Sequence, residues 1–237
     1  KDIIRIGYQH AGLTKNQSII KTRLKNDYEP DLVWVTGKKV QKILKNRKTL
    51  VVGSYKVRNK IKLINSKKIN CLVVPEGIKS ECKKMFQFSI DSAKMLPNIN
   101  FIWRLHPILD YKHILRELNY KKKLPKNIII SKNKKVDYDI AKSKICIFRG
   151  SSVVFNALSS GLFAIYLNLN EKISIDSSNG LKCWKMNIND VYQFKNFINN
   201  LYRIELKKIE NKKIAMKYSS QYFEGFNMKQ VLKNIKN

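Results

Sequence analysis

The chain has 237 residues, which is enough for one large domain or for one domain and part of another. It carries 48 basic and 17 acidic side chains, for a net charge of +31, and no apolar stretch approaches the roughly 20 residues that a membrane-spanning helix needs. The sequence therefore argues against an integral membrane protein. No signal peptide precedes the first predicted strand, and the start at Lys1 instead of Met suggests a fragment.

The charge admits three interpretations. Lys, Asn and Ile dominate throughout the chain, as an AT-rich genome would dictate, and this bias requires no partner. An anionic membrane surface or substrate is the second interpretation, and nucleic acid is the third. The lysines are spread over nearly every segment and no nucleic-acid-binding signature accompanies them. We therefore rank the compositional bias first and expect no specific nucleic acid.

The first part of the chain predicts a small α/β unit. Apolar runs at 2–9, 31–37 and 49–54 predict strands, and the pattern of 38–46 predicts a short amphipathic helix. A polar, lysine-rich stretch at 56–69 follows and could link two domains. We place the boundary after residue 66.

From residue 67 onward, strand and helix patterns alternate regularly. The predicted strands are 70–77, 98–107, 127–133, 144–150 and 162–168, and the helices between them are 80–96, 112–119, 137–143 and 151–161. Five strands alternating with helices are typical of a doubly wound, Rossmann-like parallel sheet. Two further helical stretches are predicted near 191–202 and 228–235, and residues 67–237 are assigned to this domain.

Open parallel sheets bind ligands at the carboxyl ends of their strands. The loops that follow four of the predicted strands are 75–77, 104–107, 131–133 and 149–152. Three of them carry Glu, Arg, His or paired Ser side chains. We therefore expect a binding site where these loops meet.

The loop at 149–152 has the chemistry of an anion site. Gly150 permits a tight turn, and Ser151 or Ser152 can cap a helix that Gly161 ends. The turn collects free backbone N–H groups, and the fork of the Arg149 guanidinium suits a phosphate or a carboxylate. The alternative is an ordinary helix cap beside a surface arginine.

Two histidines follow predicted strands. His106 is one of three histidines in the chain, and Pro107 fixes the backbone behind it. Its imidazole could hydrogen-bond a phosphate and stabilise it as it leaves, and the Ser pair two strands later favours this over a histidine satisfied by backbone groups. His10 could be a catalytic base or a histidine packed at a domain edge, and the sequence leaves the two open.

Other motifs are weak or missing. Asp137 and Asp139 resemble the DxD that holds a metal in some sugar transferases, but they open a short helix, where Asp caps and favours the dipole. The sequence contains no GxGxxG, Walker lysine loop, HExxH or GxSxG. Dehydrogenase, P-loop, zincin and hydrolase functions therefore lack support. The four cysteines have no metal-ligand spacing and indicate reduced thiols in a cytoplasmic protein.

His106 and Pro107, together with Ser151 and Ser152, give the sequence a resemblance. It resembles the C-terminal, nucleotide-sugar-binding half of a GT-B glycosyltransferase, and more narrowly the bacterial sialyl-, polysialyl- and Kdo-transferases that use CMP-activated acidic sugars. In that group an HP motif and a later serine pair contact the CMP phosphate and the sugar carboxylate. The resemblance covers residues 70–237. It implies that residues 1–66 are the end of an incomplete acceptor-side domain.

The resemblance implies a metal-independent glycosyl transfer without a cofactor. The residues that would stabilise the leaving phosphate or hold the donor are Arg104, His106, Pro107, Arg149, Gly150, Ser151 and Ser152, while Glu76 and Gly77 would shape the loop nearest the sugar. The chain departs from the sialyltransferases because it lacks their acidic D/E-D/E-G motif. Either His10 supplies the base, or the base lies before Lys1.

The implied partners are a CMP-sugar donor and a surface-polysaccharide or lipid-linked glycan acceptor. Capsule or lipopolysaccharide synthesis would place the protein in the cytoplasm, with contact to the anionic inner-membrane surface as an option. Two alternatives stay open. One is a UDP-sugar or CDP-glycerol transferase on the same scaffold, and the other is a non-catalytic basic module that binds an anionic polymer.

Overall fold

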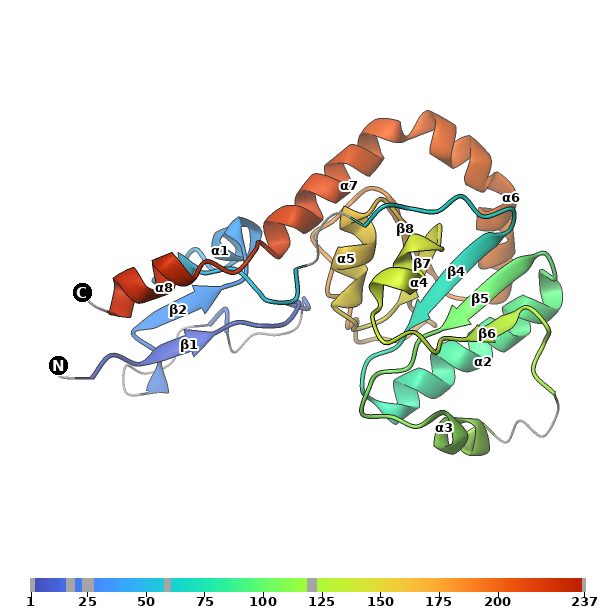
Figure 1. The fold of residues 1–237 in the computed structure, drawn as a ribbon, viewed down its shortest axis with the longest axis horizontal. Coiled ribbons are helices and arrows are strands. Elements are labelled where there is room, and N and C mark those ends of the chain that lie inside the picture. Colours follow the sequence, from blue (N-terminus) through green and yellow to red (C-terminus); the bar gives the residue numbers. More distant parts are fainter. Residues whose placement is uncertain (1–2, 16–19, 23–27, 58–60, 119–122, 236–237) are drawn as a thin grey trace.

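The computed structural model describes residues 3–15, 20–22, 28–57, 61–118 and 123–235 and contains two parallel β-sheets (Figure 1). Part of the predicted linker, residues 58–60, lies outside the described residues. So do the first two residues of the chain, residue 119 of one predicted helix, and the last two residues. Both ends of the described chain lie beside the smaller sheet (Figure 1).

The smaller sheet comes from the N-terminal part of the chain. Its strands are β1 (Ile6–Tyr8), β2 (Leu32–Val35) and β3 (Thr49–Val51), all parallel and in that order. Helix α1 (Lys38–Ile43) connects β2 to β3 and buries Val40. The predicted strand–helix–strand unit is therefore present.

The larger sheet has six parallel strands in the order β6-β5-β4-β7-β8-β9. They are β4 (Ile69–Val74), β5 (Ile99–Trp103), β6 (Ile128–Ile130), β7 (Ile145–Phe148), β8 (Phe163–Leu167) and β9 (Lys185–Ile188). Counted from β4, this is the order 3-2-1-4-5-6 of doubly wound sheets. Every residue of β7 and β8 is buried, as expected of continuous apolar strands covered on both faces. The predicted Rossmann-like fold class is confirmed, and β9 adds a strand that was not predicted.

Helices connect and cover these strands. They are α2 (Lys79–Met95), α3 (Tyr111–Glu117), α4 (Asp137–Ala141), α5 (Val153–Ser159) and α6 (Val191–Lys207). The crossovers through α2 and α5 run in opposite directions along the sheet, so right-handed connections place these two helices on opposite faces. Helix α6 packs against α2, and α5 packs against α7 (Ile209–Tyr222).

The end of the chain returns to the smaller sheet. After α7, the N–H of Glu224 donates to the Thr36 carbonyl and the Glu224 carbonyl accepts from the Ser54 N–H, each at 2.8 Å. Gly53 has a positive φ of 81°, and a side chain there would collide with the Gly225 backbone. Helix α8 (Met228–Ile235) follows, and its Gln230 lines a hollow together with residues of α1 and β3. By its contacts this last segment accompanies the first sheet, whereas the sequence assigned it to the second domain.

Candidate functional site

The site begins at the point where the larger sheet reverses direction. Strands β4 and β7 are neighbours, and their pairing aligns Val74 with Phe148, while β4 and β5 align Val73 with Trp103. The three strands therefore end at nearly the same level. The crossover from β4 leads toward β5 and that from β7 leads toward β8, so a crevice is expected between the two loops.

Glu76 and Gly150 meet between these two loops. The Glu76 carboxylate occupies the space that a Cβ atom on residue 150 would need, so the loop after β7 can approach it only because residue 150 is glycine. The pKa of Glu76 is raised, first by burial and then by the charge of Glu81, while Arg149 opposes the shift. A half-buried carboxyl group with a raised pKa therefore lies at the centre of the predicted site.

His106 lies at the neighbouring strand end. A Cβ atom on Gly77 would lie 3.3 Å from His106 Nδ1 and 2.8 Å from Ile108 Cδ1, so the loops after β4 and β5 touch. His106 and Pro107 are both exposed. The imidazole is therefore accessible to solvent at this end of the sheet.

Ser151 and Ser152 lie at the start of α5, partly buried. Ser152 is the N-cap residue, but its side chain makes no capping hydrogen bond within the described chain. The Ser151 hydroxyl accepts only a long bond, of 3.4 Å, from the Val153 N–H. Helix capping thus engages these hydroxyls weakly, in contrast to Asp190, which caps α6 by accepting from the Gln193 N–H at 2.8 Å.

Arg149 differs from the sequence expectation of a phosphate contact. Its side chain is 1% exposed and forms ion pairs with Glu81 and Glu171. Its Nη1 also donates to the Leu167 carbonyl at 2.6 Å and to the Asn168 carbonyl at 3.2 Å. The guanidinium is therefore occupied in tying β7 to α2 and to the end of β8, because the residue points into the core instead of the crevice.

The expectation that Arg104 contacts the phosphate is corrected for the same reason. Its guanidinium donates to Asp139 Oδ2 at 2.8 Å and to the carbonyls of Asn133 at 2.6 Å and Lys134 at 3.0 Å. Asp139 is buried and also accepts from Ser131 and Asn133. Arg104 thus organises the loop after β6, and the DxD aspartate is its partner. Among the described residues, no group of three or more His, Cys, Asp or Glu side chains could hold a metal ion.

His10 belongs to a loop that faces the larger sheet. The imidazole is exposed, and the Lys56 ammonium donates to the His10 carbonyl at 3.2 Å. Two residues further on, a Cβ atom on Gly12 would lie 2.7 Å from Ser177 Cβ. The Leu13 N–H donates to the Tyr222 hydroxyl at 2.7 Å. The loop after β1 therefore packs against residues that follow the larger sheet, Ser177 and Tyr222, as well as against its own sheet.

Ser177 connects this loop to the start of α5, and sequence reasoning missed it. Its hydroxyl donates to the Ser151 carbonyl at 3.5 Å. Asp176 fixes the surrounding loop by accepting from Lys185 Nζ at 2.5 Å and from the Ser178 N–H at 2.8 Å. The signal was present, because the polar run 174–180 follows the predicted strand 162–168 and obeys the same strand-end rule as the other loops.

No helix of the described chain is long and apolar enough to cross a membrane. This finding agrees with the hydropathy of the sequence.

Comparisons with known proteins place the fold. No family model matches the chain, and no curated protein matches it in sequence. Among solved structures, the glycosyltransferase of kitacinnamycin is 11% identical with a TM-score of 0.61, over 87% of this chain and 55% of that one. The UDP-GlcNAc 2-epimerase from Neisseria meningitidis bound to UDP-GlcNAc is 13% identical with a TM-score of 0.58, over 98% and 70%. The wall teichoic acid polymerase TagF with CDPG is 13% identical with a TM-score of 0.52, over 97% and 64%.

Identities this low establish the fold alone. The chain spans little more than half of the first of these structures and about two thirds of the third. Over that length it has the GT-B, Rossmann-like α/β fold that glycosyltransferases and a nucleotide-sugar epimerase share.

Proposed function

We propose that the chain forms part of a glycosyltransferase whose nucleotide-activated donor lies across the carboxyl ends of the larger sheet. The observation that supports this most is the meeting of three strand-end loops where the sheet reverses, through the contacts of Glu76 with Gly150 and of Gly77 with His106. The glycosyltransferase-type fold agrees with it.

The proposed chemistry is a metal-independent transfer. Glycosyl transfer passes through an oxocarbenium-like state while negative charge builds on the departing phosphate. Because Arg104 and Arg149 are engaged elsewhere, the groups that would stabilise this charge are the His106 imidazole and the hydroxyl and amide groups of Ser151 and Ser152. His10 would accept the proton of the acceptor hydroxyl from the opposite side of the crevice.

The donor we favour is a CMP-activated acidic sugar, because of the order HP then Ser-Ser along the sheet. The acceptor would be a surface-polysaccharide or lipid-linked glycan, and the protein would act at the cytoplasmic face of the inner membrane. The similarity to TagF with CDPG and to an epimerase with UDP-GlcNAc supports a second candidate, a CDP-glycerol or UDP-sugar transferase.

A nucleotide panel tests the proposal directly. A ligand that binds only the folded state raises the melting temperature by mass action. We expect CMP to raise it more than CDP, UDP or GDP. A stronger response to UDP or CDP would select the second candidate, and no response to any nucleotide would contradict a donor site in this chain.

Substitutions at the serine pair locate the nucleotide. Asp at position 151 or 152 keeps a capping side chain but sets a carboxylate against the phosphate. We expect Ser151→Asp or Ser152→Asp to abolish CMP binding while the melting temperature of the free protein is kept. Asn is the matched neutral control and should bind CMP. Retained CMP affinity in both Asp variants would contradict the phosphate position.

A further inference from the structure

Helix α6 carries apolar side chains on two opposite faces. The inner face contains the buried residues Phe194, Phe197 and Leu201. At about 100° per residue, Tyr192, Tyr202 and Leu206 fall within a sector of about 80° on the opposite side, and all three are more than half exposed. A helix that only covers a sheet normally has a polar outer face, so this second apolar face requires another explanation.

The exposed apolar residues continue into α7. Lys208 alone separates the end of α6 from the start of α7, and Figure 1 shows the two helices meeting at a corner on the outside of the molecule. Leu206 and Ile209 lie three residues apart across this junction. We call the surface the α6–α7 corner and define it by four apolar residues that are more than half exposed, Tyr202, Leu206, Ile209 and Ile214.

Basic side chains are interleaved with these apolar residues. Residues 202–214 contain five basic and two acidic side chains, and Arg203, Lys207 and Lys208 are exposed. Cations occur throughout this protein, so the apolar side chains among them are the informative feature. The combination favours an anionic bilayer, because burial of apolar groups at the headgroup boundary and attraction to anionic lipids add to each other. Tyrosine in particular is enriched at that boundary.

The corner is attached to the amino end of the larger sheet. Glu205 Oε2 lies 3.8 Å from Nζ of Lys144, which directly precedes β7. The Lys212 ammonium lies 5.8 Å from the ring centroid of Trp184, which directly precedes β9. The proposed donor site lies at the carboxyl ends of the same strands. A surface that covers the corner therefore leaves the donor site uncovered.

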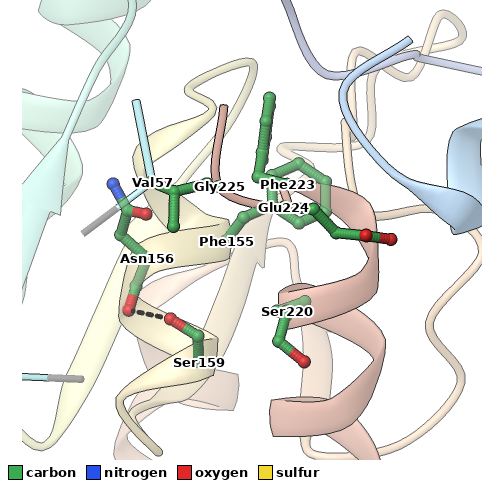
Figure 2. Close-up of a pocket in the computed structure, with 9 residues that line it drawn as sticks. Val57, Phe155, Asn156, Ser159, Ser220, Phe223, Glu224 and Gly225 are labelled. Atoms are coloured by element: carbon green, nitrogen blue, oxygen red, sulfur yellow. Dashed lines mark hydrogen bonds between the residues drawn. The ribbon is translucent and has the colours of Figure 1, made fainter. Parts of the chain in front are cut away.

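Helix α7 connects the corner to α5. The two helices pack together, and Tyr222 at the end of α7 stacks on Phe155 of α5 with ring centroids 4.0 Å apart. Figure 2 shows Ser220 and Phe223 at this end of α7, on the other side of a hollow from Asn156 of α5. The corner therefore presents its side chains on helices that are packed against the rest of the protein.

Two other occupants fit the corner less well. A second copy of the chain would set the same cations against each other, which is unfavourable. The phosphates of a nucleic acid would pair with the cations but would leave the leucine and isoleucine side chains in water. We propose that the α6–α7 corner docks on an anionic lipid bilayer, with Tyr202, Leu206 and Ile209 in the headgroup layer. This docking would provide the membrane contact of the proposed function, and it does not depend on the donor site.

Co-sedimentation of the full chain with phospholipid vesicles tests the docking. One set of vesicles contains phosphatidylcholine alone, and the other contains equal parts of phosphatidylcholine and phosphatidylglycerol. We expect saturable binding to the anionic vesicles and much weaker binding to the neutral ones. No binding to the anionic vesicles, or equal binding to both sets, would overturn the proposal.

A variant that keeps every charge separates insertion from attraction alone. Tyr202→Ser combined with Leu206→Ser should weaken binding to anionic vesicles by about tenfold or more, because the apolar side chains no longer enter the bilayer. The matched control is Met228→Ser combined with Leu232→Ser, which removes two half-exposed apolar side chains from the basic helix α8. The control should bind like the unaltered protein. Unchanged affinity in the first variant, or an equal loss in both, would contradict docking at the corner.

A second pair of variants tests the cations. Lys207→Gln combined with Lys208→Gln should weaken binding to anionic vesicles by about 25-fold, or about fivefold for each cation near the surface. Lys229→Gln combined with Lys233→Gln on α8 gives the same change in net charge and should weaken it far less. Equal losses would show that the net charge of the whole protein attracts the vesicles, and the proposal would be wrong.

Nucleotide and RNA titrations separate this proposal from the alternatives. The variant with Ser at positions 202 and 206 should respond to CMP as the unaltered protein does, because the corner lies at the other end of the strands. Vesicle binding without any CMP response would remove the donor site and leave the corner, and the reverse result would remove the corner. If this variant lost affinity for random RNA but not for anionic vesicles, the surface would belong to a nucleic acid and the proposal would be overturned.

Discussion

Arg149 illustrates how a single side chain can change the interpretation of a loop. It is fully buried between two carboxylates, and Lys84 completes the cluster by binding Glu171 at 2.5 Å and Glu81 at 3.0 Å. The pKa of Glu171 is lowered, first by the hydrogen bond from Lys84 and also by Arg149. The arginine therefore stabilises the loop after β7 by holding the ends of β7 and β8 together.

Removing Arg149 should destabilise the fold. Breaking a buried ion pair typically costs about 3–5 kcal/mol, because the partner charge stays buried and unpaired. We expect Arg149→Ala to lose stability on this scale in urea denaturation, and Arg149→Ala combined with Glu81→Gln to lose less. A stable Arg149→Ala protein that no longer binds nucleotide would instead restore the sequence expectation.

His106 should behave in the opposite way. It is exposed and contributes little packing, so His106→Ala should leave the melting temperature nearly unchanged. Loss of one group that stabilises the leaving phosphate typically lowers turnover on the order of 100-fold or more. The control is His113→Ala, which removes a partly exposed histidine of α3 that contacts Lys79 and Glu117. Unchanged donor turnover in a folded His106→Ala protein would remove His106 from the site.

Glu76 predicts a pH dependence of stability. Its pKa in the folded state lies above the ordinary value of 4.5, so the folded state binds this proton more tightly than the unfolded state does. The contribution is fully present below pH 4.5 and is lost as pH rises through the folded-state pKa. Glu76→Gln should therefore raise the melting temperature at neutral pH, and the difference from the unaltered protein should shrink on acidification. A constant difference across this range would contradict the prediction.

At the scale of elements, the strands of the larger sheet were predictable because most are short apolar runs between turn residues. Strand β9 was missed because its four residues, KMNI, bury only Ile188. Helix α7 was missed because its buried face consists of Ala215, Ser219 and two tyrosines, which give no apolar periodicity in the sequence.

The candidate site was predictable to the same extent. Strand-end loops can be located from the order of elements, so Glu76, Gly77, His106 and the serine pair could be named. The direction in which a side chain points at a strand end cannot be predicted in this way. Arg104 and Arg149 both pair with carboxylates inside the protein. The return of the last segment to the first sheet also leaves no local signal, because it depends on contacts between residues far apart in sequence.

That return predicts the effect of a truncation. A chain that ends at Tyr222 would lose the Glu224 bonds to Thr36 and Ser54 and the bond from the Asn227 N–H to the Val52 carbonyl. We expect residues 28–57 to become sensitive to protease and to fast amide exchange, while the larger sheet keeps its protection. A chain that ends at Asn227 retains these three bonds and is the matched control. Equal protection of the first sheet in both would contradict the prediction.

At the scale of the whole molecule, the even distribution of the positive charge predicts weak binding of nucleic acid. Basic residues occur on the helices and loops of both sheets, and several are already engaged by the few carboxylates. We expect random RNA to bind weakly at physiological salt in fluorescence anisotropy, with a shallow dependence on ionic strength. Tight binding that weakens steeply with salt would show that the positive charge serves a nucleic acid.

The crossing of the last segment onto the first sheet also fixes the order of events during synthesis. Thr36 leaves the ribosome 186 residues before Tyr222, whose carbonyl accepts from the Thr36 hydroxyl. At about 5–20 residues per second, this separation corresponds to roughly 10–40 seconds of translation. During that time the larger sheet can form, while β2 and β3 still lack their contacts with the segment that follows α7. Strands β2 and β3 are therefore synthesised long before the segment that completes their surroundings, and they lack the bonds from Thr36 and Ser54 to that segment until Glu224 has left the ribosome.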